Sequence, residues 1–222
     1  MLGFGRGAEV VRPEDALPGR DEPVRLSGVH FVHGRPILPP WPDGTQVAVL
    51  GMGCFWGAER ILWQLDGVWT TFVGYAGGTT PNPTYREVCS GRTGHAEVAV
   101  TVFDPDVIAY ERILADFWEQ HDPTQGMRQG NDVGTQYRSI LLVTGEEQRA
   151  VAEASRDRYQ SALDASGHGR ITTAIEPLGS LYHAEEEHQQ YLAKHPGGYC
   201  NHGFCQAPYV PGARTPGAGG VR

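Results

Sequence analysis

Cys54 stands where a thiol could act as a nucleophile. It follows the apolar run 47–50 and the glycines Gly51 and Gly53, and apolar side chains then recur with helical spacing from residue 55 to residue 65. This pattern predicts a strand, a tight turn and a helix that begins at Cys54. A thiol at the first turn of a helix lies near the positive dipole end and beside free N–H groups, which lower its pKa. A buried structural cysteine is the alternative interpretation, because free cysteines are often buried.

The glycines around Cys54 also suggest a nucleotide-binding turn, which we disfavour. In the G-x-G-x-x-G pattern the third glycine would come one place earlier than Gly57, and Phe55 and Trp56 fill the turn that a phosphate must approach. We interpret the two aromatic residues as walls of a small apolar pocket, with core packing as the alternative.

Three further cysteines are spread along the chain. Cys200 and Cys205 lie in a glycine-rich C-terminal segment, whereas Cys89 has no such surroundings and is interpreted as structural. Four widely spaced cysteines do not suit a disulfide scaffold, so we expect free thiols. A zinc site built from His195, Cys200, His202 and Cys205 is a weaker alternative, because their spacing is unlike that of zinc knuckles. We therefore expect no metal.

Composition narrows the classes of partner. The 222 residues carry 18 Lys and Arg against 26 Asp and Glu, and the net charge of −8 disfavours nucleic acids and anionic membranes. The longest uncharged apolar run, 47–58, is shorter than the roughly 18 residues of a spanning helix, and residues 1–12 lack the apolar stretch of a signal peptide. We expect a cytoplasmic protein.

Hydrophobic periodicity divides the chain into three parts. We expect an N-terminal arm packed on the core (1–45), a catalytic domain (46–195) and a flexible C-terminal tail (196–222). Expected strands cover 47–50, 69–75, 97–103, 139–143 and 171–175, and expected helices cover 55–65, 110–121, 146–165 and 184–194. A capping box at 144–147 would open the third helix. Residues 79–96 and 122–138 are expected to be long loops, the second of them functional.

These elements mix without strict alternation, which predicts an α+β fold rather than a doubly wound parallel sheet. We expect a two-layer sandwich whose order is compatible with a ferredoxin-like split βαβ core.

The octapeptide from Gly53 to Arg60 resembles the active-site signature of the peptide methionine sulfoxide reductase A family, whose members reduce the S epimer of methionine sulfoxide. Further blocks similar to that family follow in the family's order, at 74–78, 81–85, 94–97, 121–123, 129–132, 134–139 and 188–192. The resemblance runs from about residue 46 to residue 200, and residues 13–20 resemble the arm of longer bacterial members.

Reduction of a sulfoxide needs a nucleophile for sulfur and a proton for the departing oxygen. The resemblance implies that Cys54 is the nucleophile and that Glu97 is the acid, kept protonated by a desolvated pocket. It also implies that the phenols of Tyr85 and Tyr137 hydrogen-bond the sulfoxide oxygen. From the residues alone, Glu97 could be a solvated charge at a strand end and the tyrosines could be ordinary half-buried side chains.

The resemblance assigns substrate binding to three more residues. Phe55 and Trp56 match the pocket for the S-methyl group, and Asp132 matches a loop carboxylate near the acid that orders water or substrate. A turn-forming aspartate is the alternative for Asp132.

The two C-terminal cysteines match thiols that regenerate the family's nucleophile. Cys200 matches the resolving cysteine, which condenses with the Cys54 sulfenic acid to form a disulfide. Cys205 resembles the recycling cysteine of longer members, although only four residues separate the pair, fewer than in some of them. Electrons would come from thioredoxin, which thioredoxin reductase and NADPH reduce in turn.

The sequence therefore predicts a monomeric peptide-methionine (S)-S-oxide reductase that acts on proteins and on the free amino acid without a bound cofactor. A general thiol peroxidase or disulfide oxidoreductase and a zinc-stabilised binding module are the alternatives.

Overall fold

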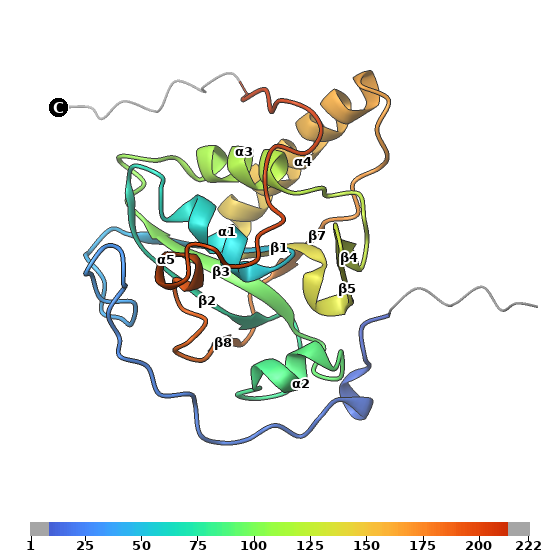
Figure 1. Cartoon of the computed structure of the whole chain (residues 1–222). Coiled ribbons are helices and arrows are strands. Elements are labelled where there is room, and N and C mark those ends of the chain that lie inside the picture. The colour runs from blue at the N-terminus through green and yellow to red at the C-terminus, as the bar shows by residue number, and fades with distance from the viewer. Residues whose placement is uncertain (1–8, 213–222) are drawn as a thin grey trace, which may run out of the picture.

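The structure is a computed structural model that describes residues 9–212. Its centre is a six-stranded sheet with the order β7-β6-β1-β3-β2-β8, in which only the β6–β7 pair is parallel (Figure 1). The strands are β1 (Gln46–Met52), β2 (Val68–Ala76), β3 (Ala96–Phe103), β6 (Ser139–Val143), β7 (Ala174–Pro177) and β8 (Leu181–His183). A small hairpin pairs β4 (Arg128–Gln129) with β5 (Asp132–Val133).

Three helices cover one face of the sheet (Figure 1). They are α1 (Phe55–Leu62), α3 (Tyr110–Gln120) and α4 (Glu146–Ala165). Alternate strand residues such as Leu50 and Met52 pack against buried helix residues such as Leu114 and Trp118. The predicted α+β arrangement of a sheet with helices is thus confirmed.

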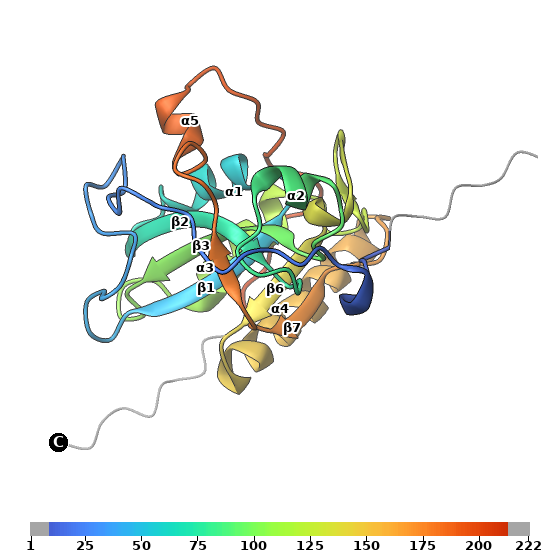
Figure 2. The same cartoon turned by 90° about the horizontal axis from the view of Figure 1, so that it is seen from below.

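The opposite face of the sheet is covered by the N-terminal arm, a long irregular segment after a short 3₁₀ turn at Pro13–Asp15 (Figure 2). Ile37 is fully buried there against strand residues such as Phe72 and Val100. On the helix side of β2, His30 Nε2 lies 2.9 Å from Thr71 Oγ1, a hydroxyl that also donates to Glu59 of α1. Both faces of β3 are therefore buried.

Several local expectations differ from the structure. Residues 79–96 contain α2 (Tyr85–Cys89), which opens with a capping box between Thr84 and Glu87. The long loop at 122–138 holds the β4–β5 hairpin and a 3₁₀ turn at Thr135–Tyr137. The capping box expected at 144–147 is wrong, because Gly145 is the N-cap of α4 and no side chain caps this helix.

The helix expected at 184–194 is also wrong for most of its length. Only α5 (Tyr191–Lys194) is helical, and β7 starts at Ala174 and is followed by an unforeseen strand, β8. Gln190 has a φ of +46°, which interrupts a helix, and its side chain and backbone N–H both bond the buried carboxylate of Glu59. The long-range contact between Gln190 and Glu59 thus prevents the helix that the local sequence pattern favours.

The described part of the C-terminal tail packs along the helices. Figure 1 shows it in red, passing α1 and then α3 and α4. His202 Nε2 lies 2.7 Å from the carbonyl oxygen of Met52, and the N–H of Cys205 donates to the carbonyl of Glu119 at 2.9 Å. Ala207 and Tyr209 then join the core between α3 and α4. In the described range, no helix has the length and apolarity to cross a membrane.

Candidate active site

Cys54 is the N-cap residue of α1, directly after β1 and the turn at Gly53. Gly53 adopts a φ of +89°, and a Cβ there would lie 2.6 Å from the Gln129 side chain, so the turn needs glycine. The strand, turn and helix predicted from the spacing are present. Cys54 itself is only 6% exposed.

Glu97 lies on β3 next to the start of α1. Its Oε2 atom accepts a 3.0 Å hydrogen bond from the backbone N–H of Phe55, whereas its buried Oε1 atom has no partner. The side chain is 1% exposed, which excludes a solvated charge. Burial raises the pKa of Glu97 to about 8, the Phe55 N–H opposes this rise, and the charge of Asp132 adds to it. Glu97 is therefore largely a protonated acid at neutral pH.

The expectation that the helix start lowers the pKa of Cys54 is wrong for this structure. Burial raises the pKa of the thiol far above its ordinary value, and the charge of Glu97 raises it further. The N–H groups of Trp56 and Gly57 act in the opposite direction without prevailing. Cys54 is a neutral thiol in the ground state, with two amide donors placed to stabilise a thiolate once the proton leaves.

Tyr85 and Tyr137 are half-buried near Glu97. Burial is the largest cause that raises the pKa of each phenol above its ordinary value, and the Glu97 charge is the next. Each phenol also contributes a lone O–H donor that stays protonated over the physiological pH range. The structure thus brings both tyrosines to the acid.

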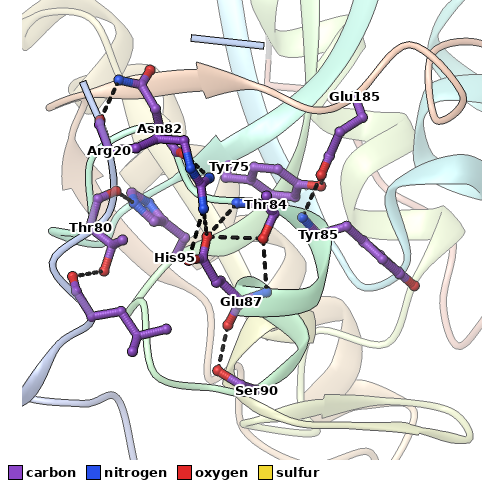
Figure 3. A network of polar contacts seen from close by, with 11 residues as sticks. Arg20, Tyr75, Thr80, Asn82, Thr84, Tyr85, Glu87, Ser90, His95 and Glu185 are labelled. Carbon is purple, nitrogen blue, oxygen red and sulfur yellow. Dashed lines mark hydrogen bonds and ion pairs between the residues drawn. The ribbon is translucent and has the colours of Figure 1, made fainter. Parts of the chain in front are cut away.

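A polar network fixes the position of Tyr85, the first residue of α2 (Figure 3). Glu185 accepts hydrogen bonds from the Tyr85 N–H at 2.7 Å and from the Tyr75 hydroxyl at 2.8 Å. Arg20 of the N-terminal arm holds Glu87 in the capping box through a 2.8 Å ion pair. Sequence reasoning missed Glu185. The T-x-x-E pattern at 84–87 was the signal that could have revealed α2.

Cys89 ends α2 and is exposed, so it is not a core residue. It is close enough to Tyr85 and Tyr137 to affect the pKa of both phenols. The thiol therefore lies at the border of the site.

An aromatic wall continues from Tyr85 along the start of α1. Phe55 is buried and Trp56 is half-buried, with ring centroids 6.4 Å and 6.5 Å from that of Tyr85. The indole of Trp56 stacks on Tyr191 of α5 at 4.0 Å and contacts His188 at 5.8 Å. These rings form a continuous apolar surface beside Tyr85, and sequence reasoning gave Tyr191 and His188 no part in it.

Asp132 reaches the site from β5 and carries contacts from the tail. Its Oδ1 atom accepts a hydrogen bond from the hydroxyl of Tyr199 at 3.2 Å, and its Oδ2 atom accepts one from Asn201 Nδ2 at 3.0 Å. Burial raises the pKa of Asp132, and these two hydrogen bonds lower it in part. Asp132 is close enough to raise the pKa of Cys54 and Glu97.

Cys200 lies over the first turns of α1. A Cβ added to Gly57 would lie 3.0 Å from the Cys200 Sγ atom and 2.2 Å from His202 Nδ1, so only glycine lets the tail approach. Gly57 is one helical turn from Cys54. The structure thereby brings Cys200 to the turn that carries the candidate nucleophile.

Cys205 is exposed near the end of α3 and is not brought to Cys54. Its thiol donates to the carbonyl oxygen of Gly203 at 2.9 Å. Desolvation of the sulfur, together with the charge of Asp122, raises the pKa of Cys205 to about 11 although the residue as a whole is exposed. All four cysteines are free.

The residues considered for zinc do not converge. Among the described residues, no three His, Cys, Asp or Glu side chains meet in a metal-binding arrangement. His202 faces the carbonyl of Met52, and His195 stacks on Tyr191 with centroids 4.6 Å apart. The side chains thus give the zinc-stabilised module no support.

Comparisons with known proteins agree on one family. The family model described as peptide methionine sulfoxide reductase matches residues 46–208. The chain is similar to peptide methionine sulfoxide reductase MsrA of Salinispora arenicola, with 63% identity over 88% of this chain and 90% of that protein. It is 60% identical to MsrA of Methylobacterium nodulans over 91% of this chain and 92% of that protein. The solved methionine sulfoxide reductase A of Corynebacterium diphtheriae has 45% identity and a TM-score of 0.78, covering 90% of this chain and 99% of that chain.

Proposed function

The chain belongs to the peptide methionine sulfoxide reductase family, and we propose that Cys54 and Glu97 carry out its reaction, the reduction of methionine sulfoxide to methionine. The observation that supports this assignment best is the hydrogen bond from the Phe55 N–H to Glu97. It joins the residue after the thiol to a buried carboxyl that is protonated at neutral pH.

In the first step Glu97 gives its proton to the sulfoxide oxygen, while the phenols of Tyr85 and Tyr137 donate hydrogen bonds to it. The Cys54 thiol loses its proton to the Glu97 carboxylate and its sulfur attacks the sulfoxide. The oxygen passes to Cys54, so the substrate leaves as methionine and the enzyme becomes a sulfenic acid. Atoms and electrons balance, because one sulfur is reduced as the other is oxidised.

The aromatic wall gives the site its handedness. Phe55 and Trp56 form the apolar surface for the S-methyl group, Tyr85 and Tyr137 hold the oxygen, and Asp132 orders substrate or water. Because these groups occupy fixed positions around one sulfur, the two sulfoxide epimers cannot both fit. The site is proposed to select the S epimer, in proteins and in the free amino acid.

The thiol is regenerated by the tail. Cys200 condenses with the sulfenic acid, forming a disulfide and water. Cys205 then attacks Cys200, releasing Cys54 and leaving a Cys200–Cys205 disulfide near the surface. Thioredoxin reduces this disulfide as an external donor, so no bound cofactor is needed. The tail has to move between these steps.

Finer features belong to the same proposal. The order β6-β1-β3-β2, with antiparallel neighbours and α1 and α3 on one face, supports a ferredoxin-like split βαβ core. The chain is proposed to act as a cytoplasmic monomer with an arm at 1–45, a catalytic domain at 46–195 and a tail at 196–222.

The proposal is tested by offering the separate S and R epimers of methionine sulfoxide with a thioredoxin system. The expected result is methionine from the S epimer alone. Turnover of the R epimer would contradict the proposed site geometry. Peroxide turnover that greatly exceeds sulfoxide turnover would favour a general thiol peroxidase instead.

A further inference from the structure

The guanidinium group of Arg60 lies against the sulfur of Cys200. Arg60 Nη2 donates to the Cys200 Sγ atom at 3.1 Å. Within residues 9–212, no carboxylate oxygen lies within 4.0 Å of an Arg60 nitrogen. Arg60 ends the octapeptide around Cys54, yet the reaction described above gives it no part.

The surroundings of Arg60 leave its charge available to Cys200. Arg60, Asp116 and His202 are among the residues that line a hollow of about 520 Å³. Asp116 is engaged by Arg112 at 2.6 Å, and Arg60 lowers the pKa of His202, which is held at about 4 mainly by burial. In the described part of the chain, the Arg60 guanidinium forms no ion pair, and its hydrogen bond goes to the Cys200 sulfur.

The residues on both sides of Cys200 hold the sulfur in place. Asn201 bonds Asp132 at 3.0 Å and the Gln129 carbonyl at 3.1 Å, and Tyr199 bonds Asp132 at 3.2 Å. His202 is fixed to the end of β1 through the Met52 carbonyl. Cys200 is therefore seated on α1 before any reaction, between the Arg60 guanidinium and the turn that carries Cys54.

We propose that Arg60 is a catalytic residue of the disulfide-forming step. Its guanidinium stabilises the negative charge on the Cys200 sulfur while this sulfur attacks the sulfenic acid of Cys54. The sulfur–sulfur bond forms, the sulfur–oxygen bond breaks, and the departing hydroxide takes the proton lost by Cys200 to give water. This role rests on the proposed function, in which Cys54 becomes a sulfenic acid and Cys200 resolves it.

The test measures how the Cys54 sulfenic acid divides between trapping by dimedone and disulfide formation with Cys200. Wild type and Arg60→Gln each receive one equivalent of methionine sulfoxide and a fixed concentration of dimedone, which traps sulfenic acids, without any reductant. Methionine is quantified, and mass spectrometry gives the ratio of dimedone adduct on Cys54 to Cys54–Cys200 disulfide. Arg60→Gln should form methionine normally but raise this ratio about tenfold, the effect of losing one hydrogen bond to a charged group.

Two further variants and one additive distinguish a catalytic role of the Arg60 charge from a purely structural role of this residue. Arg60→Lys keeps the positive charge and should restore most of the wild-type ratio, and millimolar guanidinium ion should restore part of it in Arg60→Gln. Arg112→Gln, which changes the arginine paired with Asp116 at the border of the hollow, should leave the ratio unchanged. An unchanged ratio in Arg60→Gln would overturn the proposal, as would a raised ratio that neither lysine nor guanidinium corrects. Failure of the wild type to form methionine would instead refute the proposed function.

Discussion

The backbone N–H of Phe55 donates a 3.0 Å hydrogen bond to the Oε2 atom of Glu97. This bond ties the first residue of α1 to the second residue of β3, so the thiol and the acid are positioned by two rigid elements. It also leaves Glu97 Oε1 without a partner beside the thiol. A free acid oxygen in a buried site is the group that a sulfoxide oxygen would meet.

Replacement of the nucleophile gives the simplest prediction. Cys54→Ser should abolish methionine formation, because a serine hydroxyl is a far weaker nucleophile than a thiol. Methionine produced from the sulfoxide is measured by chromatography. Cys89→Ser, which changes the exposed cysteine at the border of the site, should keep most of the activity. Substantial activity in Cys54→Ser would refute the assignment.

Removal of the acid should slow the first step and change its pH dependence. Glu97→Gln should lower the single-turnover rate by roughly 10²–10⁴-fold, the usual contribution of a general acid. Because the pKa of Glu97 is raised to about 8, the acid form is present below pH 8 and is lost above it. The wild-type rate should therefore fall as the pH rises through about 8. Glu153→Gln on α4 should keep this fall, whereas a fall retained by Glu97→Gln would remove Glu97 from the mechanism.

Loss of the resolving thiol should separate chemistry from turnover. Cys200→Ser should form about one methionine per enzyme and then stall with thioredoxin as donor, because no disulfide can form with Cys54. A burst measurement counts methionine against enzyme. Sustained thioredoxin-driven turnover would show that another group resolves the sulfenic acid.

Gly57 offers a steric test of tail docking. The alanine methyl group in Gly57→Ala would meet His202 Nδ1 at 2.2 Å and Cys200 Sγ at 3.0 Å, so the tail must shift. We expect normal methionine formation in the first turnover but slower formation of the Cys54–Cys200 disulfide. Alanine favours helix over glycine by about 1 kcal/mol, so α1 itself should not be weakened. An unchanged disulfide rate would mean that Cys200 reacts from another position.

The buried carboxyl of Glu59 should make the free energy of unfolding depend on pH. This fully buried carboxyl accepts hydrogen bonds from Thr71 at 3.0 Å and from Gln190 at 2.7 Å and 2.8 Å. Burial raises its pKa from 4.5 to about 7, and the hydrogen bonds limit this rise. The folded state therefore binds the proton more tightly, and the stability that this proton gives is present below pH 4.5 and lost as the pH rises through 7.

Glu59→Gln cannot titrate, and its amide resembles the protonated acid. Relative to wild type, its free energy of unfolding should rise by roughly 3 kcal/mol between pH 4.5 and pH 7, from 1.4 kcal/mol per unit of pKa shift. Denaturant unfolding of both proteins across this range provides the measurement. A difference that stays constant with pH would show that Glu59 keeps an ordinary pKa.

Strands and helices were predictable from the sequence where the local residue pattern favours the same structure as the tertiary contacts do. Glycine spacing and helical periodicity locate the turn and helix at Cys54, and β-branched residues mark β3. The five residues of α2 are too few to show periodicity, and only the T-x-x-E pattern at 84–87 reveals it. The helix expected from Ala184 fails because Gln190 is bound by Glu59, which lies far away in the sequence.

The electrostatics of the site could not be predicted from local rules. The helix start at Cys54 favours a thiolate, but its burial and its closeness to Glu97 and Asp132 reverse the direction of the shift. These neighbours come from β3 of the central sheet and from β5 of the separate hairpin, and only the folded chain brings them together. Similarly, the glycine-rich composition after residue 195 suggests a mobile segment but does not reveal the buried contacts of His202 and Ala207.

Asp132 accepts hydrogen bonds from Tyr199 and Asn201 of the tail, and the same carboxylate is proposed to bind substrate or water. A substrate that binds Asp132, as proposed above, competes with Tyr199 and Asn201 for this carboxylate, so binding of substrate disfavours seating of the Cys200 segment. By reciprocity, departure of the repaired methionine side chain favours return of this segment, when the sulfenic acid awaits its partner. In the proposed cycle, Asp132 would therefore couple release of the product to the approach of Cys200.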